Sequence, residues 1–418
     1  MTKEQKDNLF VLVKSLSKSE KRQFKLFVGR LGVNEDSKFL TLFNILEKLS
    51  SYDEAVILKK GIVKKQQLSN LKAHLYKQIL ISLRLNPLHQ NIRIQIREQL
   101  DFATILYHKG LYKQSLKILD KAKTLAIANE EKNIAYEIIE LEKVIESQYI
   151  TRSISNRADE LTIQAKEMSQ QNVLASKLSN LSLQLYGLFL KTGYVKNDEE
   201  YKRIKKYFND RLPKYDINTL GFREKLWLYN AYLWYSFLIQ DFLSCYKYSK
   251  KWVNLFYDNP KMIKLNPVFF LRGNQYLLEA LFFIRHHEKF KKTLSDLENI
   301  TNEKWFPKDD NVEGLIFLYV YTNKFNLHFM EGSFREGLPM VKDVLEGLKK
   351  YQNRIDEHHV MVFYYKIASL YFGIGENKKC IEFLDKIISN KSLQMREDLR
   401  SEERRVGKEC RSRWSPYH

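Results

Sequence analysis

Two segments far apart in the chain share one twenty-residue layout. Residues 103–122 read ATILYHKGLYKQSLKILDKA, and residues 368–387 read ASLYFGIGENKKCIEFLDKI. Each segment opens on alanine, reaches a glycine seven positions later and continues with a second apolar pattern. Because residues three and four positions apart share one side of a helix, each segment predicts two helices joined by a tight turn.

The same layout recurs elsewhere, closely at residues 325–344 and more weakly at 234–252 and 281–300. Glycine suits the point where the first helix stops and reverses, because it tolerates left-handed backbone angles. A small residue near the start of the second helix lets the paired helices approach closely. We interpret the two cysteines among these positions as small buried packing residues rather than reactive thiols. The packing positions are Ala103, Gly110, Ser115, Cys245, Thr293, Gly332, Gly337, Ala368, Gly375 and Cys380.

This layout resembles the tetratricopeptide repeat. The resemblance implies a solenoid of stacked helical hairpins whose concave face binds a peptide or helix of a partner protein. Most turns are 43 to 48 residues apart, which exceeds the roughly 34 residues of the typical motif. A wider gap predicts a further repeat within residues 135–170, and the unusual spacing means that no ligand-binding position is carried over. The chain is also similar to bacterial helical-repeat proteins that open with a segment like LVKSLSKSEKRQFK, a resemblance that implies no settled activity.

The first 90 residues predict a separate bundle of helices. Apolar residues at helical spacing recur three times in the first fifty residues, and Ser17 with Glu20 has the pattern of a capping box. The chain contains only 15 Gly and 7 Pro, which favours long helices. We therefore predict an all-α chain, with an N-terminal helical bundle at residues 1–90 and an α-solenoid of tetratricopeptide-like hairpins at residues 91–399.

The last residues, 400–418, have a different composition. They read RSEERRVGKECRSRWSPYH and resemble the translation of a common sequencing adapter, rather than a natural basic tail that binds nucleic acid. Without them the formal net charge falls from +20 to +17. Residues 392–399 read as the start of a helix, so we expect the natural chain to continue beyond Leu399.

Positive charge is concentrated in the N-terminal region. Residues 55–97 contain nine Lys or Arg and no Asp or Glu, and residues 1–90 contain 17 basic and 8 acidic residues. Such a surface attracts polyanions, and about four or five phosphate contacts would give a slope of about −4 for log affinity against log salt. A solvated lysine-rich helix face is the alternative. The candidate contacts with a polyanion or an acidic partner are Lys59, Lys60, Lys64, Lys65, Lys77 and Arg84.

No catalytic or cofactor motif is evident in the sequence. It contains no phosphate-binding glycine loop, dinucleotide fingerprint, zinc-protease motif or nucleophile elbow. Residues 309–314 match only the first half of a calcium loop. We expect no enzyme activity, no catalytic residue, no metal and no cofactor. The polar N-terminus, the short apolar runs and three irregularly spaced cysteines predict a cytoplasmic protein without a membrane segment.

Two functions agree with these observations. The favoured one is a non-enzymatic scaffold or adaptor that binds a protein or peptide in the concave face of the repeats. The alternative is a regulator whose basic N-terminal region contacts nucleic acid while the repeats sense a partner.

Overall fold

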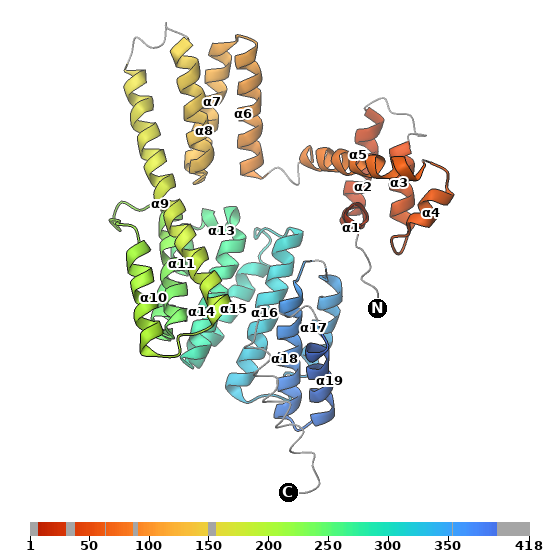
Figure 1. Cartoon of the computed structure of the whole chain (residues 1–418), viewed down its shortest axis with the longest axis vertical. Coiled ribbons are helices and arrows are strands. Elements are labelled where there is room, and N and C mark those ends of the chain that lie inside the picture. The colour runs from red at the N-terminus through yellow and green to blue at the C-terminus, as the bar shows by residue number, and fades with distance from the viewer. Residues whose placement is uncertain are drawn as a thin grey trace. The chain divides into compact units, whose positions relative to one another are not determined.

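The fold was analysed in a computed structural model that describes residues 7–30, 38–62, 64–86, 91–148, 156–352 and 354–390. Across these ranges the regular structure consists of 19 α-helices and no strand, so the prediction of an all-α chain is confirmed (Figure 1). The chain divides into two compact units, residues 1–126 and 127–418, which we describe separately. The adapter-like segment 400–418 and the helix expected at 392–399 lie outside the described residues.

The first five helices share one apolar core. Leu42, Phe43 and Leu75 are completely buried in it, together with Phe24 and Val28. The capping box predicted ahead of the second helix is present, because Ser17 N–H donates to Glu20 Oε2 at 2.7 Å and Glu20 N–H donates to Ser17 Oγ at 3.2 Å. These helices are α1 (Asn8–Ser15), α2 (Lys18–Arg30), α3 (Lys38–Lys48), α4 (Glu54–Lys59) and α5 (Lys65–Arg84).

A helical pair follows, formed by α6 (Ile92–His108) and α7 (Tyr112–Ala128). The Ser115 hydroxyl donates a hydrogen bond to the Ala103 carbonyl at 2.7 Å. Both residues are completely buried, so a small side chain on each helix allows this close contact.

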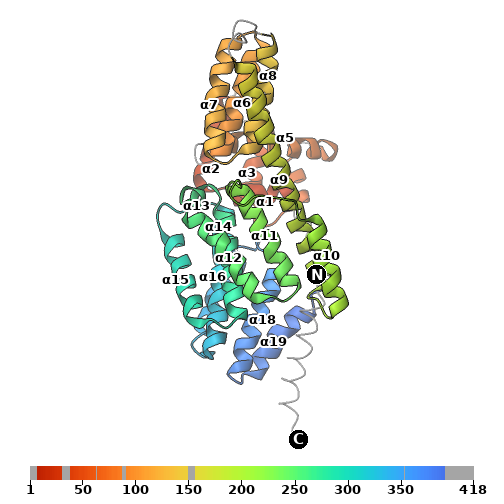
Figure 2. The same cartoon turned by 90° about the vertical axis from the view of Figure 1, so that its left-hand side faces the viewer.

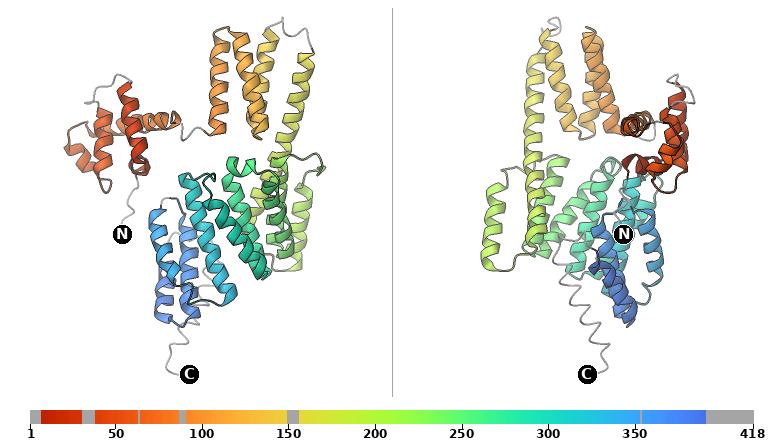
Figure 3. Two further views of the ribbon diagram at one scale, coloured as in Figure 1. Left: turned by 180° about the vertical axis from the view of Figure 1, so that it is seen from behind. Right: turned by 45° about the vertical axis from the view of Figure 1, so that its right-hand side comes forward.

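The second unit continues with helices packed largely in chain order. Helix α11 packs on α9 and α12, α14 packs on α12, α15 and α16, and α18 packs on α19 (Figures 2 and 3). The helices are α8 (Lys132–Gln148), α9 (Arg157–Thr192), α10 (Asp198–Arg211), α11 (Phe222–Leu238), α12 (Phe242–Tyr257), α13 (Lys261–Leu265), α14 (Pro267–Phe283), α15 (His287–Asn302), α16 (Asp310–Glu331), α17 (Pro339–Lys350), α18 (Glu357–Gly373) and α19 (Asn377–Ile388). Helix α8 and the long helix α9 occupy the region where the sequence predicted a further repeat within residues 135–170.

One turn geometry ends the first helix of five pairs in the described ranges, namely α6–α7, α11–α12, α14–α15, α16–α17 and α18–α19. A residue with φ between 54° and 84° is followed by a backbone N–H that donates to the carbonyl five residues earlier, at 2.9–3.1 Å. This is the Schellman arrangement, which satisfies carbonyls at the end of a helix. The left-handed residues are Gly110, Gln240, Arg285, Gly332 and Gly375. The sequence layout predicted the three glycines but gave no sign of a left-handed Gln240 or Arg285.

The predicted packing positions differ in how closely they follow the layout. Cys245, Cys380 and Ala368 are completely buried, and Thr293 is half-buried. Gly337 is buried but does not lie on a helix as expected, because α17 begins only at Pro339. Proline favours the first turn of a helix, which accounts for the later start.

No helix in the described ranges is both long enough and apolar enough to cross a membrane.

Candidate functional sites

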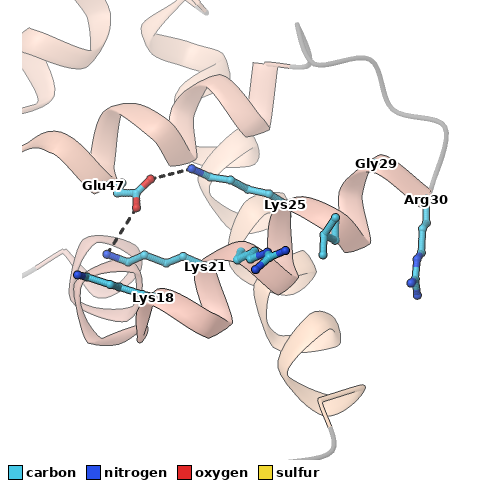
Figure 4. Close-up of a pocket in the computed structure, with 8 residues that line it drawn as sticks. Lys18, Lys21, Lys25, Gly29, Arg30 and Glu47 are labelled. Atoms are coloured by element: carbon cyan, nitrogen blue, oxygen red, sulfur yellow. Dashed lines mark hydrogen bonds and ion pairs between the residues drawn. The ribbon is translucent and has the colours of Figure 1, made fainter.

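Helix α2 has one buried side and one strongly basic side. Phe24 and Val28 point into the core of the first five helices, so the residues on the opposite side remain at the surface. These residues and one acid from α3 line an open hollow with a volume of about 940 Å³ (Figure 4). The lining consists of Lys18, Lys21, Arg22, Lys25, Leu26, Gly29, Arg30 and Glu47. We call its five cations the α2 basic face.

A single carboxylate neutralises part of this face. Lys25 Nζ lies 2.9 Å and Lys21 Nζ 3.8 Å from the two carboxylate oxygens of Glu47. The hydrogen bond from Lys25 and the charges of Lys21 and Lys14 lower the pKa of Glu47 below its ordinary value, despite some desolvation. Glu47 therefore stays ionised at neutral pH. The lining still carries a formal net charge of +4.

The other three cations of the face are exposed, and no counter-ion for them lies among the described residues. Within the described part of the chain, no hydrogen bond or ion pair joins Lys18, Arg22 or Arg30 to another residue. Figure 4 shows Arg30 extending away from Glu47, whereas Lys21 and Lys25 point toward it. These three charges are available to an external anion.

The six basic residues singled out in the sequence lie on neighbouring helices. Lys59 and Lys60 are at the end of α4, Lys64 and Lys65 are at the start of α5, and all four are exposed. Their contact with a polyanion remains a prediction.

The remaining two of the six lie farther along α5. Lys77 is exposed there. Arg84 forms an ion pair of 2.9 Å with Asp101, so part of its charge is neutralised within the chain.

Sequence reasoning missed the α2 basic face. Its signal was present, because Lys18, Lys21, Arg22 and Lys25 recur three and four positions apart, out of step with Phe24. The segment also contains the acidic residue Glu20, whose carboxylate is engaged in the capping box.

The second unit contains a different kind of polar site, which we call the amide row: Gln275, Asn323, Asn326 and Lys366. The row crosses three helices as one chain of hydrogen bonds. Lys366 Nζ on α18 donates to Asn326 Oδ1 at 2.5 Å, and Asn326 Nδ2 donates to Asn323 Oδ1 at 3.3 Å, both on α16. Asn323 Nδ2 then donates to Gln275 Oε1 on α14 at 2.6 Å. Asn323 is completely buried and Asn326 nearly so.

The lysine at the start of this row lies in an unfavourable environment for a charge. Burial lowers the pKa of Lys366 to about 8, and the charge of the Glu279 carboxylate opposes part of this shift. Within the described part of the chain, its only hydrogen-bond acceptor is the neutral Asn326 amide. The side chain also lies over the Phe329 ring, with its nitrogen 5.5 Å from the ring centre.

Further polar side chains on α14 extend the amide row. Arg272, Gln275, Tyr276 and Glu279 are spaced three and four residues apart and so share one side of the helix. Burial raises the pKa of both Tyr276 and Tyr319, and Tyr319 shares a hydrogen bond with Arg272. Tyr276 on α14 and Tyr319 on α16 therefore remain uncharged at neutral pH.

We next consider metal-binding groups and free thiols in the described ranges. They contain no group of three or more His, Cys, Asp or Glu arranged to hold a metal ion. Cys245 and Cys380 are buried free thiols, and burial raises the pKa of Cys245 well above its ordinary value. A raised pKa makes the reactive thiolate scarce, which agrees with a packing role.

Comparison with known proteins identifies no family for this chain. No family model matches it, and no curated protein or solved structure is significantly similar to it. The structure alone shows an all-helical protein of many packed helices, which is consistent with a helical-repeat fold.

Proposed function

We propose that this protein is a non-enzymatic scaffold that binds an extended peptide segment of a partner across α14, α16 and α18. The observation that supports the proposal is the amide row. The two ends of the row, Gln275 and Lys366, are only half-buried, so their remaining donors can pair with the carbonyl or carboxylate groups of a peptide, while buried Asn323 and Asn326 hold these ends in place. The proposal keeps the adaptor function expected from the repeats and assigns it to specific residues.

The amide row has a direction that suits this role. Every link passes a hydrogen bond from Lys366 toward Gln275, so each amide polarises the next. At the far end, no residue in the described part of the chain accepts a hydrogen bond from the Gln275 amide nitrogen. A peptide carbonyl or carboxylate is the natural acceptor for this polarised donor.

The position of Lys366 also supports binding. A partly buried ammonium without a carboxylate partner reduces stability, and replacing buried charges by apolar groups often stabilises a protein. Positions that reduce stability are frequently retained for function. A ligand that brings a negative charge close to Lys366 would relieve this cost.

A peptide-display experiment tests the proposal. The full chain is used to select from a library of short random peptides, and enriched peptides are measured by isothermal titration. We expect Gln275→Leu and Lys366→Met to weaken binding by about tenfold or more, equivalent to about 1.4 kcal/mol for the loss of a charge-assisted contact.

Lys177→Met on α9 is the matched control, because Lys177 is exposed and distant in sequence from the row. It should bind as the parent does. The proposal fails if no peptide is enriched, or if the enriched peptides bind the two row variants as tightly as the parent chain.

A further inference from the structure

The α2 basic face lies in the other unit and is not used by the proposed scaffold function. We infer that it is a docking surface for the sugar–phosphate backbone of double-stranded nucleic acid, bound without sequence preference. The lysines and arginines of α2 itself supply the contacts, in particular Lys18, Arg22 and Arg30.

Charge density is the first reason. The five cations span Lys18 to Arg30, which at about 1.5 Å per residue is about 18 Å along the helix. A duplex carries one negative charge for about every 1.7 Å of its axis. It therefore presents enough phosphates within this length to neutralise the net charge of the lining.

The burial of α2 argues against a membrane surface as the partner. A helix that lies on a bilayer inserts an apolar side between the lipids. The apolar side of α2 is already used, since Phe24 and Val28 are buried in the core of the first five helices.

The composition of the lining argues against the other macromolecules. Protein interfaces depend on aromatic or apolar anchors, and single-stranded nucleic acid is held by aromatic side chains on which the bases stack. The hollow has no aromatic residue in its lining, and Leu26 is its one large apolar side chain. Charge is its main means of recognition, and a regular phosphate backbone is the partner that charge alone can hold.

Gly29 leaves space for a close approach. A Cβ built at this position would meet no atom of the described residues within 4 Å, so internal packing does not require glycine here. The absent side chain exposes the helix backbone between Lys25 and Arg30. A side chain here would instead stand in the path of an approaching strand.

Fluorescence anisotropy with labelled DNA and RNA duplexes of the same length tests the inference, between about 50 and 200 mM salt. For three or four phosphate contacts, we expect a slope of about −3 for log affinity against log salt. The variant Lys18→Gln, Arg22→Gln, Arg30→Gln should bind about 100-fold more weakly at low salt and lose most of this slope. The ratio of DNA to RNA affinity shows which duplex is preferred.

A matched control removes three charges elsewhere. Lys202, Arg203 and Lys206 on α10 are exposed, and replacing them by Gln should leave duplex affinity within about twofold. All variants keep residues 400–418, so any contribution of that basic segment cancels. Circular dichroism confirms that each variant remains helical.

Glu47→Gln gives a change in the opposite direction. It removes the internal counter-ion of Lys21 and Lys25, so duplex affinity should rise several-fold and the salt slope should steepen by about one. The inference is overturned if the parent chain does not bind duplexes, or if the α10 control loses as much affinity as the α2 variant. Tighter binding to a poly-glutamate peptide or to phosphatidylserine-rich vesicles than to duplexes would also overturn it.

Discussion

Lysine has opposite environments in the two candidate sites. On α2, Lys18 is exposed and has no internal partner in the described ranges, so its charge remains fully hydrated. On α18, Lys366 is partly buried against neutral amides, and its pKa falls to about 8. The comparison separates a hydrated, exposed charge from one that a neighbouring amide holds in a partly buried position.

One ion pair chosen from each unit shows a similar contrast in burial. The pair Arg84–Asp101 in the first unit has side chains that are 56% and 60% exposed. The pair Lys132–Glu224 in the second unit is 8% and 1% exposed, at 3.2 Å, and joins the start of α8 to the first turn of α11. Exposed pairs contribute little to stability, whereas a buried charge that loses its partner is strongly destabilising.

Breaking the buried pair should have the largest effect. Glu224→Gln leaves Lys132 buried with only the Glu130 carboxylate at 3.3 Å, and we expect the free energy of unfolding to fall by about 3 kcal/mol. Asp101→Asn in the exposed pair should change it by less than about 0.5 kcal/mol. Urea unfolding measures both, and equal effects would remove the distinction between the two pairs.

The titration of Lys366 should have the next largest effect. Its pKa of about 8 in the folded chain lies below the ordinary value of 10.5, so from pH 8 to 10.5 the unfolded chain binds more protons. Stability due to this group is therefore lowest below pH 8 and rises as pH increases through that window. Lys366→Met should raise the free energy of unfolding at pH 7 by about 2 kcal/mol and add nothing near pH 10.5.

Lys18→Met on α2 is the control for this titration, and it should change stability by less than about 0.5 kcal/mol at either pH. Urea unfolding at several pH values measures both variants. A Lys366 variant that is no more stable than the parent at pH 7 would show that the two lysines have equivalent environments.

A gel shift at low salt relates the predicted lysines to the α2 basic face. Replacing Lys59, Lys60, Lys64 and Lys65 together by Glu should weaken duplex binding by about tenfold through general electrostatic repulsion. This is less than the loss expected from neutralising three charges on α2. Complete loss with the α4–α5 reversal and none with the α2 variant would instead place the docking surface at the α4–α5 junction.

The smallest effect is expected at Arg84. Its charge is shared with Asp101, so Arg84→Gln should reduce duplex affinity by less than about twofold. Lys77→Gln on the same helix removes an exposed charge and should have at least as large an effect. Anisotropy titrations at one salt concentration are sufficient to rank the two.

The sequence predicted the elements that depend on local physics. The helical pairs, the glycines of three turns and the burial of Cys245 and Cys380 follow from helical periodicity and residue size. The start of α17 at Pro339 was missed because the layout placed Gly337 on the second helix. The choice between a loop and another helical turn there depends on packing between pairs, which no local pattern encodes.

The amide row was not predictable in the same way. Asn323 and Asn326 are ordinary residues in an apolar helix. Their hydrogen-bonded row forms only with Gln275 and Lys366, which are about 40 to 50 residues away in the sequence. The α2 basic face was predictable in principle, since its spacing is local. Only the burial of Phe24 showed which side of α2 remained accessible.

Two of the three left-handed non-glycine residues in the described ranges, Gln240 and Arg285, differ in what compensates their backbone strain. Gln240 adopts φ 58°, and its side-chain amide donates to the Val195 carbonyl at 2.9 Å, which fastens the turn to the loop after α9. Arg285 adopts φ 54° with no comparable bond in the described part of the chain. A left-handed non-glycine residue costs about 1–2 kcal/mol. Replacing Arg285 by glycine would remove this strain and should therefore raise the melting temperature of the chain. The substitution lies outside both candidate sites.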